Sequence, residues 1–172
     1  MWVSHFKRQD IFWRSAMSGG RATLLSRNKR QKGFVQPGDI TAVDPLGHIV
    51  TQLFCVEAKF YKDLFMFSPV WGDKGYMDLI WHKPLAEARA ANREPMVVAK
   101  QNMKPALMLT TEAGSVILGS ALRHPEDGGF SLRCRFPSLD MYIYQFADML
   151  TDVEVDILRE KYARPQVEGE AV

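Results

Sequence analysis

The sequence predicts an α/β protein in which helices flank a mixed β-sheet. Along residues 3–110, stretches of helical periodicity alternate with short apolar runs that are typical of strands. Their order is helix, strand, strand, helix, strand, strand, and a mixed sheet covered by helices accommodates that order. Composition agrees, because 47% hydrophobic and 24% charged residues are usual values for a globular protein.

The first element is a predicted helix at residues 3–17. Asp10 falls on its apolar stripe, where a carboxylate needs a partner or a metal unless it lies at the solvated margin. Ser18-Gly19-Gly20 ends the helix, and the polar, basic residues 21–37 follow as a loop. The stripe itself consists of Trp2, Phe6, Trp13 and Met17.

A β-hairpin is predicted next, from apolar runs at residues 38–44 and 48–59 that an Asp-Pro-Leu-Gly turn separates. Asp39 opens the first run, and Glu57 and Lys59 close the second. Residues i and i+2 of a strand share a face. One face of the hairpin is therefore expected to gather two carboxylates and an ammonium.

The rest of the chain gives weaker patterns. A proline is accepted in the first turn of a helix, so a helix is predicted to begin at Pro84. The further predicted elements are the helix at 84–93, a hairpin of 96–99 and 106–110, strands at 116–118 and 130–136, and one or two helices within 139–162.

Charge is distributed unevenly along a chain whose formal net charge is +2. Residues 1–38 carry eight Lys or Arg residues against one acidic residue, whereas residues 148–172 carry seven acidic residues against three basic ones. A basic end on a near-neutral chain favours a polyanionic partner, although a solvated basic loop has the same composition.

Several classes are excluded by what the sequence lacks. It has no run of 18 apolar residues, so no membrane span is expected, and no phosphate loop or dinucleotide fingerprint, so no nucleotide cofactor is expected. Cys55 and Cys134 are predicted to be reduced thiols of a cytoplasmic protein. The four histidines show no zinc-site spacing with either cysteine.

The predicted hairpin has the residues of a hydrolytic metal site. Asp39, Glu57 and the carbonyl of Ala58 supply hard oxygen ligands, which suit Mg²⁺ or Mn²⁺ as a substitute. Lys59 is placed to orient an attacking water and to offset charge on a phosphodiester in the transition state. The alternative is structural: a turn aspartate and an ion pair between two same-face residues at a strand end.

These segments together resemble the PD-(D/E)xK nuclease superfamily, and within it the archaeal and phage-type Holliday junction resolvases. The resemblance covers residues 3–110 and implies a restriction-endonuclease-like core at 1–111, with a helix, a mixed central sheet and a flanking helix. Residues 112–172 are then a C-terminal α+β extension packed on the core. The motifs are Ser18-Gly19-Gly20, Gly38-Asp39-Ile40, Val56-Glu57-Ala58-Lys59 and Met96-Val97-Val98-Ala99-Lys100.

The resemblance implies a Mg²⁺-dependent endonuclease that selects branched DNA and acts as a homodimer in the cytoplasm, that of the host if a phage or other mobile element encodes it. It implies catalytic roles for Asp39, Glu57 and Lys59, with Ala58 and Asp10 as further metal ligands. The chain departs from the family in having Gly38 before Asp39, and Asp10 where Glu is more usual. The expected nucleic-acid contacts are Ser18, Arg21, Arg27, Lys29, Arg30 and Lys32.

Other readings stay open at this point. The chain can be a restriction or repair nuclease of the same superfamily acting on linear duplex, or a non-catalytic nucleic-acid-binding or assembly protein that reuses the fold. Residues 112–172 can instead carry the specific function by binding a partner. Phe65, Trp71 and Trp81 suit base stacking but also a core or a dimer interface.

Overall fold

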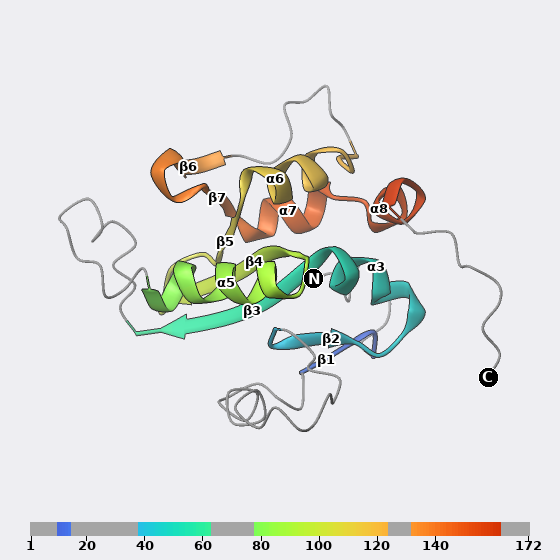
Figure 1. Cartoon of the computed structure of the whole chain (residues 1–172), viewed down its shortest axis with the longest axis horizontal. Helices are drawn as coiled ribbons and strands as arrows, with labels where there is room; N and C mark the ends of the chain where they lie inside the picture. The colour runs from blue at the N-terminus through green and yellow to red at the C-terminus, as the bar shows by residue number, and fades with distance from the viewer. Residues whose placement is uncertain (1–9, 15–37, 63–77, 124–131, 163–172) are drawn as a thin grey trace.

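The computed structural model describes residues 10–14, 38–62, 78–123 and 132–162, which form an α/β fold (Figure 1). Its centre is a five-stranded mixed sheet with strand order β3-β4-β5-β7-β6. Strands β3 and β4 are parallel, and the remaining neighbours are antiparallel. Strands β1 and β2 form a separate two-stranded antiparallel sheet.

The described elements have the following bounds, with η2 a π-helix and η4 a 3-10 helix. In chain order they are β1 (Phe12–Arg14), β2 (Ile40–Ala42), α3 (Pro45–Leu53), β3 (Phe54–Tyr61), η2 (Asp78–His82), α5 (Lys83–Ala90), β4 (Glu94–Gln101), β5 (Leu107–Thr110), α6 (Glu112–Gly119), β6 (Leu132–Phe136), η4 (Pro137–Leu139), β7 (Met141–Gln145), α7 (Phe146–Asp152) and α8 (Val155–Tyr162). Among these helices, none is long and apolar enough to cross a bilayer.

The two faces of the sheet are covered by different helices. Helices α3, α6, α7 and α8 pack on one face and build the larger core, which includes Phe54, Val56 and Met96 of the sheet. The opposite face packs against η2 and α5 and includes Trp81, Val97 and Leu109. The indole N–H of Trp81 donates to the carbonyl of Leu139 at 2.9 Å, so the buried indole is a core residue and not a stacking platform.

The sheet also contains residues from the second half of the chain. Strand β7 pairs with β5, and β6 pairs with β7 at the edge opposite β3. Strands β6 and β7 therefore belong to the same sheet as β3, β4 and β5.

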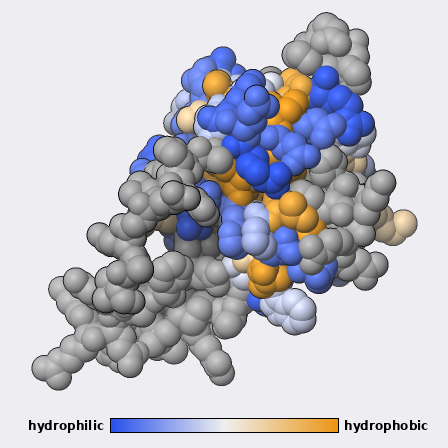
Figure 2. Space-filling view, turned by 90° about the vertical axis from the view of Figure 1, so that its right-hand side faces the viewer, coloured by the Kyte–Doolittle hydropathy of each residue, from blue (hydrophilic) through white to orange (hydrophobic). Residues whose placement is uncertain are grey.

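The outer surface over α3 and α8 is mixed in polarity. Seen from that side, hydrophobic and hydrophilic residues are interleaved (Figure 2). Val43 and Leu46, which flank the start of α3, are the exposed large apolar residues near it. Scattered exposure of this kind is ordinary for a protein surface.

The predicted helix at residues 3–17 is wrong at residues 12–14, which form strand β1. Trp13 pairs with Thr41 of β2 and is exposed, whereas Ile11, which directly precedes the strand, is fully buried. The other residues of that predicted helix, except Asp10 and Ile11, lie outside the described residues.

The predicted hairpin is also wrong, because helix α3 separates β2 from β3. The side chain of Asp44 accepts a hydrogen bond from the N–H of Leu46 at 2.9 Å, and Pro45 occupies the first helical position. Asp before Pro is therefore a helix N-cap here and not a turn. The second apolar run becomes a strand only from Phe54 onward.

Of the elements predicted after the hairpin, some are confirmed and others are wrong. The helix predicted at 84–93 is confirmed as α5, and the hairpin predicted at 96–99 and 106–110 is confirmed as β4 and β5. The strand predicted at 116–118 is wrong, because Thr111 caps helix α6 by accepting from the N–H of Gly114. Within 139–162 the helices α7 and α8 are confirmed, but residues 141–145 form β7.

Candidate active site

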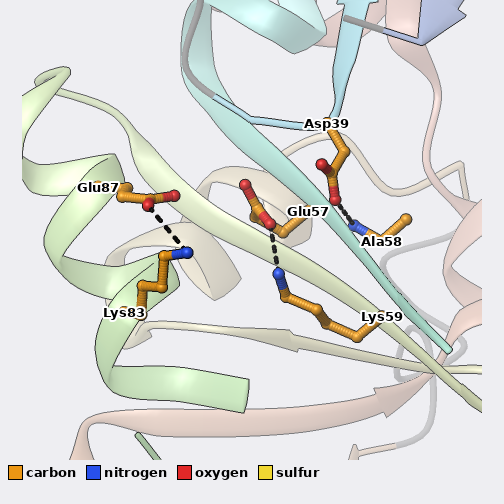
Figure 3. Close-up of polar contacts among 6 residues, drawn as sticks. All are labelled: Asp39, Glu57, Ala58, Lys59, Lys83 and Glu87. Atoms are coloured by element: carbon orange, nitrogen blue, oxygen red, sulfur yellow. Dashed lines mark hydrogen bonds and ion pairs between the residues drawn. The ribbon is translucent and has the colours of Figure 1, made fainter. Parts of the chain in front are cut away.

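Asp39 is fixed to the free edge of β3 by two hydrogen bonds. Its backbone N–H donates to the carbonyl of Val56 at 2.8 Å, and its Oδ2 accepts from the N–H of Ala58 at 3.0 Å (Figure 3). Within the described part of the chain β3 is the last strand of the sheet on this side, so no described strand pairs with these groups of Val56 and Ala58. Asp39 therefore takes the place of a partner strand at the point where β2 begins.

Gly38 permits this close approach. Its φ is +88°, a backbone conformation that residues with a side chain rarely adopt. A Cβ atom added there would lie 2.7 Å from the carbonyl oxygen of Val56. Both constraints favour glycine over any other residue. The Gly-Asp pair thus has a local physical reason: glycine lets the chain touch β3, and the next residue carries the carboxylate.

Glu57 and Lys59 lie side by side on the face of β3 that is turned toward α5. Lys59 Nζ is 2.7 Å from Glu57 Oε2 (Figure 3). The Glu57 side chain is only 9% exposed and that of Lys59 is 20% exposed. A buried carboxylate is costly unless it is paired and hydrogen-bonded, and Lys59 supplies that compensation.

Electrostatics follow from this burial. Loss of solvent raises the pKa of Glu57, the contact with Lys59 opposes that rise, and the charges of Asp39 and Glu87 add to it. Burial alone would lower the pKa of Lys59, but the hydrogen bond and charge of Glu57 outweigh it, so the pKa of Lys59 is raised. The site thus holds an excess of negative charge that one ammonium partly offsets.

Cys55 lies on β3 two residues before Glu57, and its thiol is unreactive. Burial, followed by the charges of Glu57 and Glu87, raises the pKa of its thiol to about 12. The residue is 1% exposed. A thiol with this pKa is neutral at physiological pH and is a poor nucleophile.

The donor set fits a magnesium ion. The described residues contain no group of three or more His, Cys, Asp or Glu side chains that could hold a metal. Mg²⁺ is commonly bound by one or two carboxylates, with waters and substrate phosphates as its remaining ligands. Asp39 and Glu57 supply that number, and the carbonyl of Ala58 is directed to the same strand edge as its N–H.

The structure does not bring every predicted residue to this place. Asp10 is exposed beside β1 and does not join Asp39 and Glu57 in a group of three ligands within the described part of the chain. The predicted nucleic-acid contacts, Ser18, Arg21, Arg27, Lys29, Arg30 and Lys32, lie outside the described residues, as do Phe65 and Trp71.

Two residues on α5 were missed by sequence reasoning. Lys83 and Glu87 form an i, i+4 pair, with Lys83 Nζ 3.8 Å from Glu87 Oε1, on the side of α5 that faces Glu57 (Figure 3). The charge of Glu87 contributes to the raised pKa of Glu57. A Lys-x-x-x-Glu spacing in the helix after the Glu-x-Lys strand was the available signal.

Comparison with known proteins found no match among protein-family models, curated proteins or solved structures. The site is therefore interpreted from its own geometry.

Proposed function

We propose that this protein is a Mg²⁺-dependent DNA endonuclease that selects branched substrates, in the manner of a Holliday junction resolvase. One observation carries the proposal. Asp39 comes from a separate segment of the chain and bonds to the backbone of Ala58, the residue after Glu57, whose carboxylate contacts Lys59 and feels the charge of Asp39. Two carboxylates with a neighbouring ammonium are suited to phosphodiester hydrolysis.

Each residue has a distinct role in this reaction. Asp39 and Glu57 would hold the cation, which when bound polarises the phosphate and lowers the pKa of a coordinated water. Lys59 would orient the attacking water and stabilise the charge that develops on the phosphate oxygens. The Asp39 bond to Ala58 would keep the carboxylate fixed beside β3, with its second oxygen available to the cation.

The basic residues at positions 21–32 supply the proposed DNA contact. Arg21, Arg27, Lys29, Arg30 and Lys32 would bind phosphates flanking the cut, and a homodimer would present two such sites to opposed strands of a junction. Each neutralised phosphate on a duplex contributes about 0.9 to the slope of log affinity against log salt. Replacing all five by glutamine should reduce that slope by at least about 2, as measured by fluorescence anisotropy.

Cleavage of labelled four-way junctions in Mg²⁺ tests the activity. Linear duplex and single strands of the same sequences serve as competing substrates, and EDTA is the metal control. Asp39→Asn and Lys59→Met should bind junctions but lose cutting, whereas Glu160→Gln, an exposed acid on α8, should cut like the parent.

The outcomes separate the alternatives. Equal cutting of duplex and junction would indicate a restriction or repair nuclease. Binding of DNA without cutting by the parent, in Mg²⁺ and in Mn²⁺, would indicate a non-catalytic protein. Unchanged cutting by Asp39→Asn would show that the active site lies elsewhere.

A further inference from the structure

The ammonium of Lys59 lies on the carboxylate that the proposed reaction needs for its metal. Its Nζ is 2.7 Å from Glu57 Oε2, in a position where four-fifths of the lysine side chain and nine-tenths of the glutamate side chain are removed from solvent. At this distance the two groups form a charge-assisted hydrogen bond. A divalent cation and this ammonium would therefore compete for one oxygen.

Charge balance links the two cations to the DNA phosphate. Asp39, Glu57 and Lys59 together carry one net negative charge when all three are ionised. A bound divalent cation would convert this to one net positive charge and would place the ammonium beside a like charge. A DNA phosphate restores neutrality, and the long, flexible side chain of Lys59 can turn from Glu57 toward it.

We propose that Lys59 is a placeholder cation: it pairs with Glu57 in the metal-free protein and transfers to the DNA phosphate when a divalent cation binds. This inference rests on the proposed nuclease function. Its consequence is a reciprocal coupling, because metal binding frees the ammonium for DNA and a phosphate that holds the ammonium frees Glu57 for metal.

Mn²⁺ binding measured by isothermal titration calorimetry without DNA tests the competition. Lys59→Met keeps most of the length of the side chain and removes its charge, so Mn²⁺ should bind about tenfold more tightly than to the parent. Lys59→Arg should stay within about twofold of the parent. Lys104→Met, which changes an exposed lysine in the turn between β4 and β5, is the matched control and should leave Mn²⁺ binding unchanged.

The same Lys59→Met protein should lose DNA cleavage. Tighter Mn²⁺ binding together with lost cleavage is the result that the proposal predicts. A lysine needed only for folding would weaken metal binding and cleavage together. The parent protein offers a second readout if Lys59→Met does not fold. With ¹⁵N-labelled lysine, the Lys59 ammonium signal should shift on saturation with Mg²⁺, and the shift should grow when a phosphate-containing oligonucleotide is added.

Failures of the two proposals are distinguishable. If folded Lys59→Met binds Mn²⁺ no more tightly than the parent, or the Lys59 signal is unmoved by saturating Mg²⁺, the placeholder role is wrong while cleavage by the parent still stands. If Asp39→Asn and Glu57→Gln bind Mn²⁺ as the parent does, no cation occupies this site, and both proposals fall.

Discussion

Val56 and Glu57 are consecutive residues of β3, and each is 6% exposed, but they face opposite sides of the sheet. Val56 lies in the apolar core beneath α3, α6, α7 and α8. Glu57 lies on the α5 side and contacts Lys59. Equal burial therefore has opposite effects on the free energy of folding. Burying the apolar side chain of Val56 stabilises the fold, whereas burying the carboxylate of Glu57 is unfavourable unless a partner compensates it.

The difference shows that one face of β3 adds apolar side chains to the larger core, whereas the other carries a buried ion pair. Hydrophobic residues of similar volume commonly replace a buried ion pair without loss of stability. Under the proposed function, the Glu57–Lys59 pair serves to bind ligands and not to stabilise the fold. Four substitutions distinguish the two faces.

Phe54→Ala should remove the largest contribution from the core face. Phe54 is 1% exposed, and truncating such a side chain costs about 3–5 kcal/mol through lost burial and the cavity left behind. Urea denaturation measures the loss. Phe60→Ala is the control on the same strand, because Phe60 is 67% exposed, and it should change the free energy of unfolding by less than about 0.5 kcal/mol. Equal losses for the two variants would contradict the assignment of the core.

Glu57→Gln should give the opposite profile. Cleavage should fall by at least about 100-fold, the usual cost of removing one group that stabilises the transition state. The free energy of unfolding should change by no more than about 1 kcal/mol, because Lys59, at 20% exposure, can turn its ammonium into water. Junction cleavage and urea denaturation on one preparation check both, with Glu160→Gln as the control. A protein that unfolds readily yet cuts normally when folded would make Glu57 a structural residue.

Gly38→Ala should affect both faces. The positive φ costs a non-glycine residue about 1–2 kcal/mol, and the new Cβ atom would meet the backbone of Val56. Asp39 should then move away from β3, so cleavage should fall with stability. Gly119→Ala, where an added Cβ has no atom within 4 Å, should be neutral or slightly stabilising in its helix. Thermal unfolding of both variants decides the comparison.

At neutral pH the smallest effect concerns Cys55. With a pKa of about 12 in the folded protein against 9.0 ordinarily, the thiol stays neutral while that of the unfolded chain ionises. Since the unfolded state releases its proton first, stability should decline as pH rises from about 9 toward 12. Cys55→Ala should show a shallower decline. At pH 8, iodoacetamide should modify the half-buried Cys134 well before Cys55 in the native protein.

The elements that were predicted correctly are those whose local sequence signal fits only one kind of secondary structure. Pro84 opens a helix, and the polar residues between β4 and β5 connect two strands, so these elements were found. Asp44 and Pro45 have two readings, since the same pair suits a turn and a helix N-cap. The apolar run at 116–118 was equally ambiguous, because short apolar runs occur in buried helices and in strands.

The sequence correctly predicted that Asp39 lies near Glu57, but it predicted the wrong chain connection between them. The two were expected as partners in a hairpin, whereas β2 reaches the edge of β3 across helix α3. The Gly-Asp and Glu-x-Lys patterns carried the prediction, and the path between them did not matter. Glu87 could not be placed in advance, because its position depends on how α5 packs over β3, which is a tertiary property. The catalytic roles of these residues stay predictions.

The attachment of Asp39 to β3 has a consequence for colloidal behaviour as well. An uncovered edge strand is a template on which another chain can add, and sheet proteins protect such edges against aggregation. Here the carboxylate segment itself covers the exposed carbonyl of Val56 and N–H of Ala58. Deleting this segment would leave these groups open to another chain, so the segment also protects the edge of β3 against aggregation.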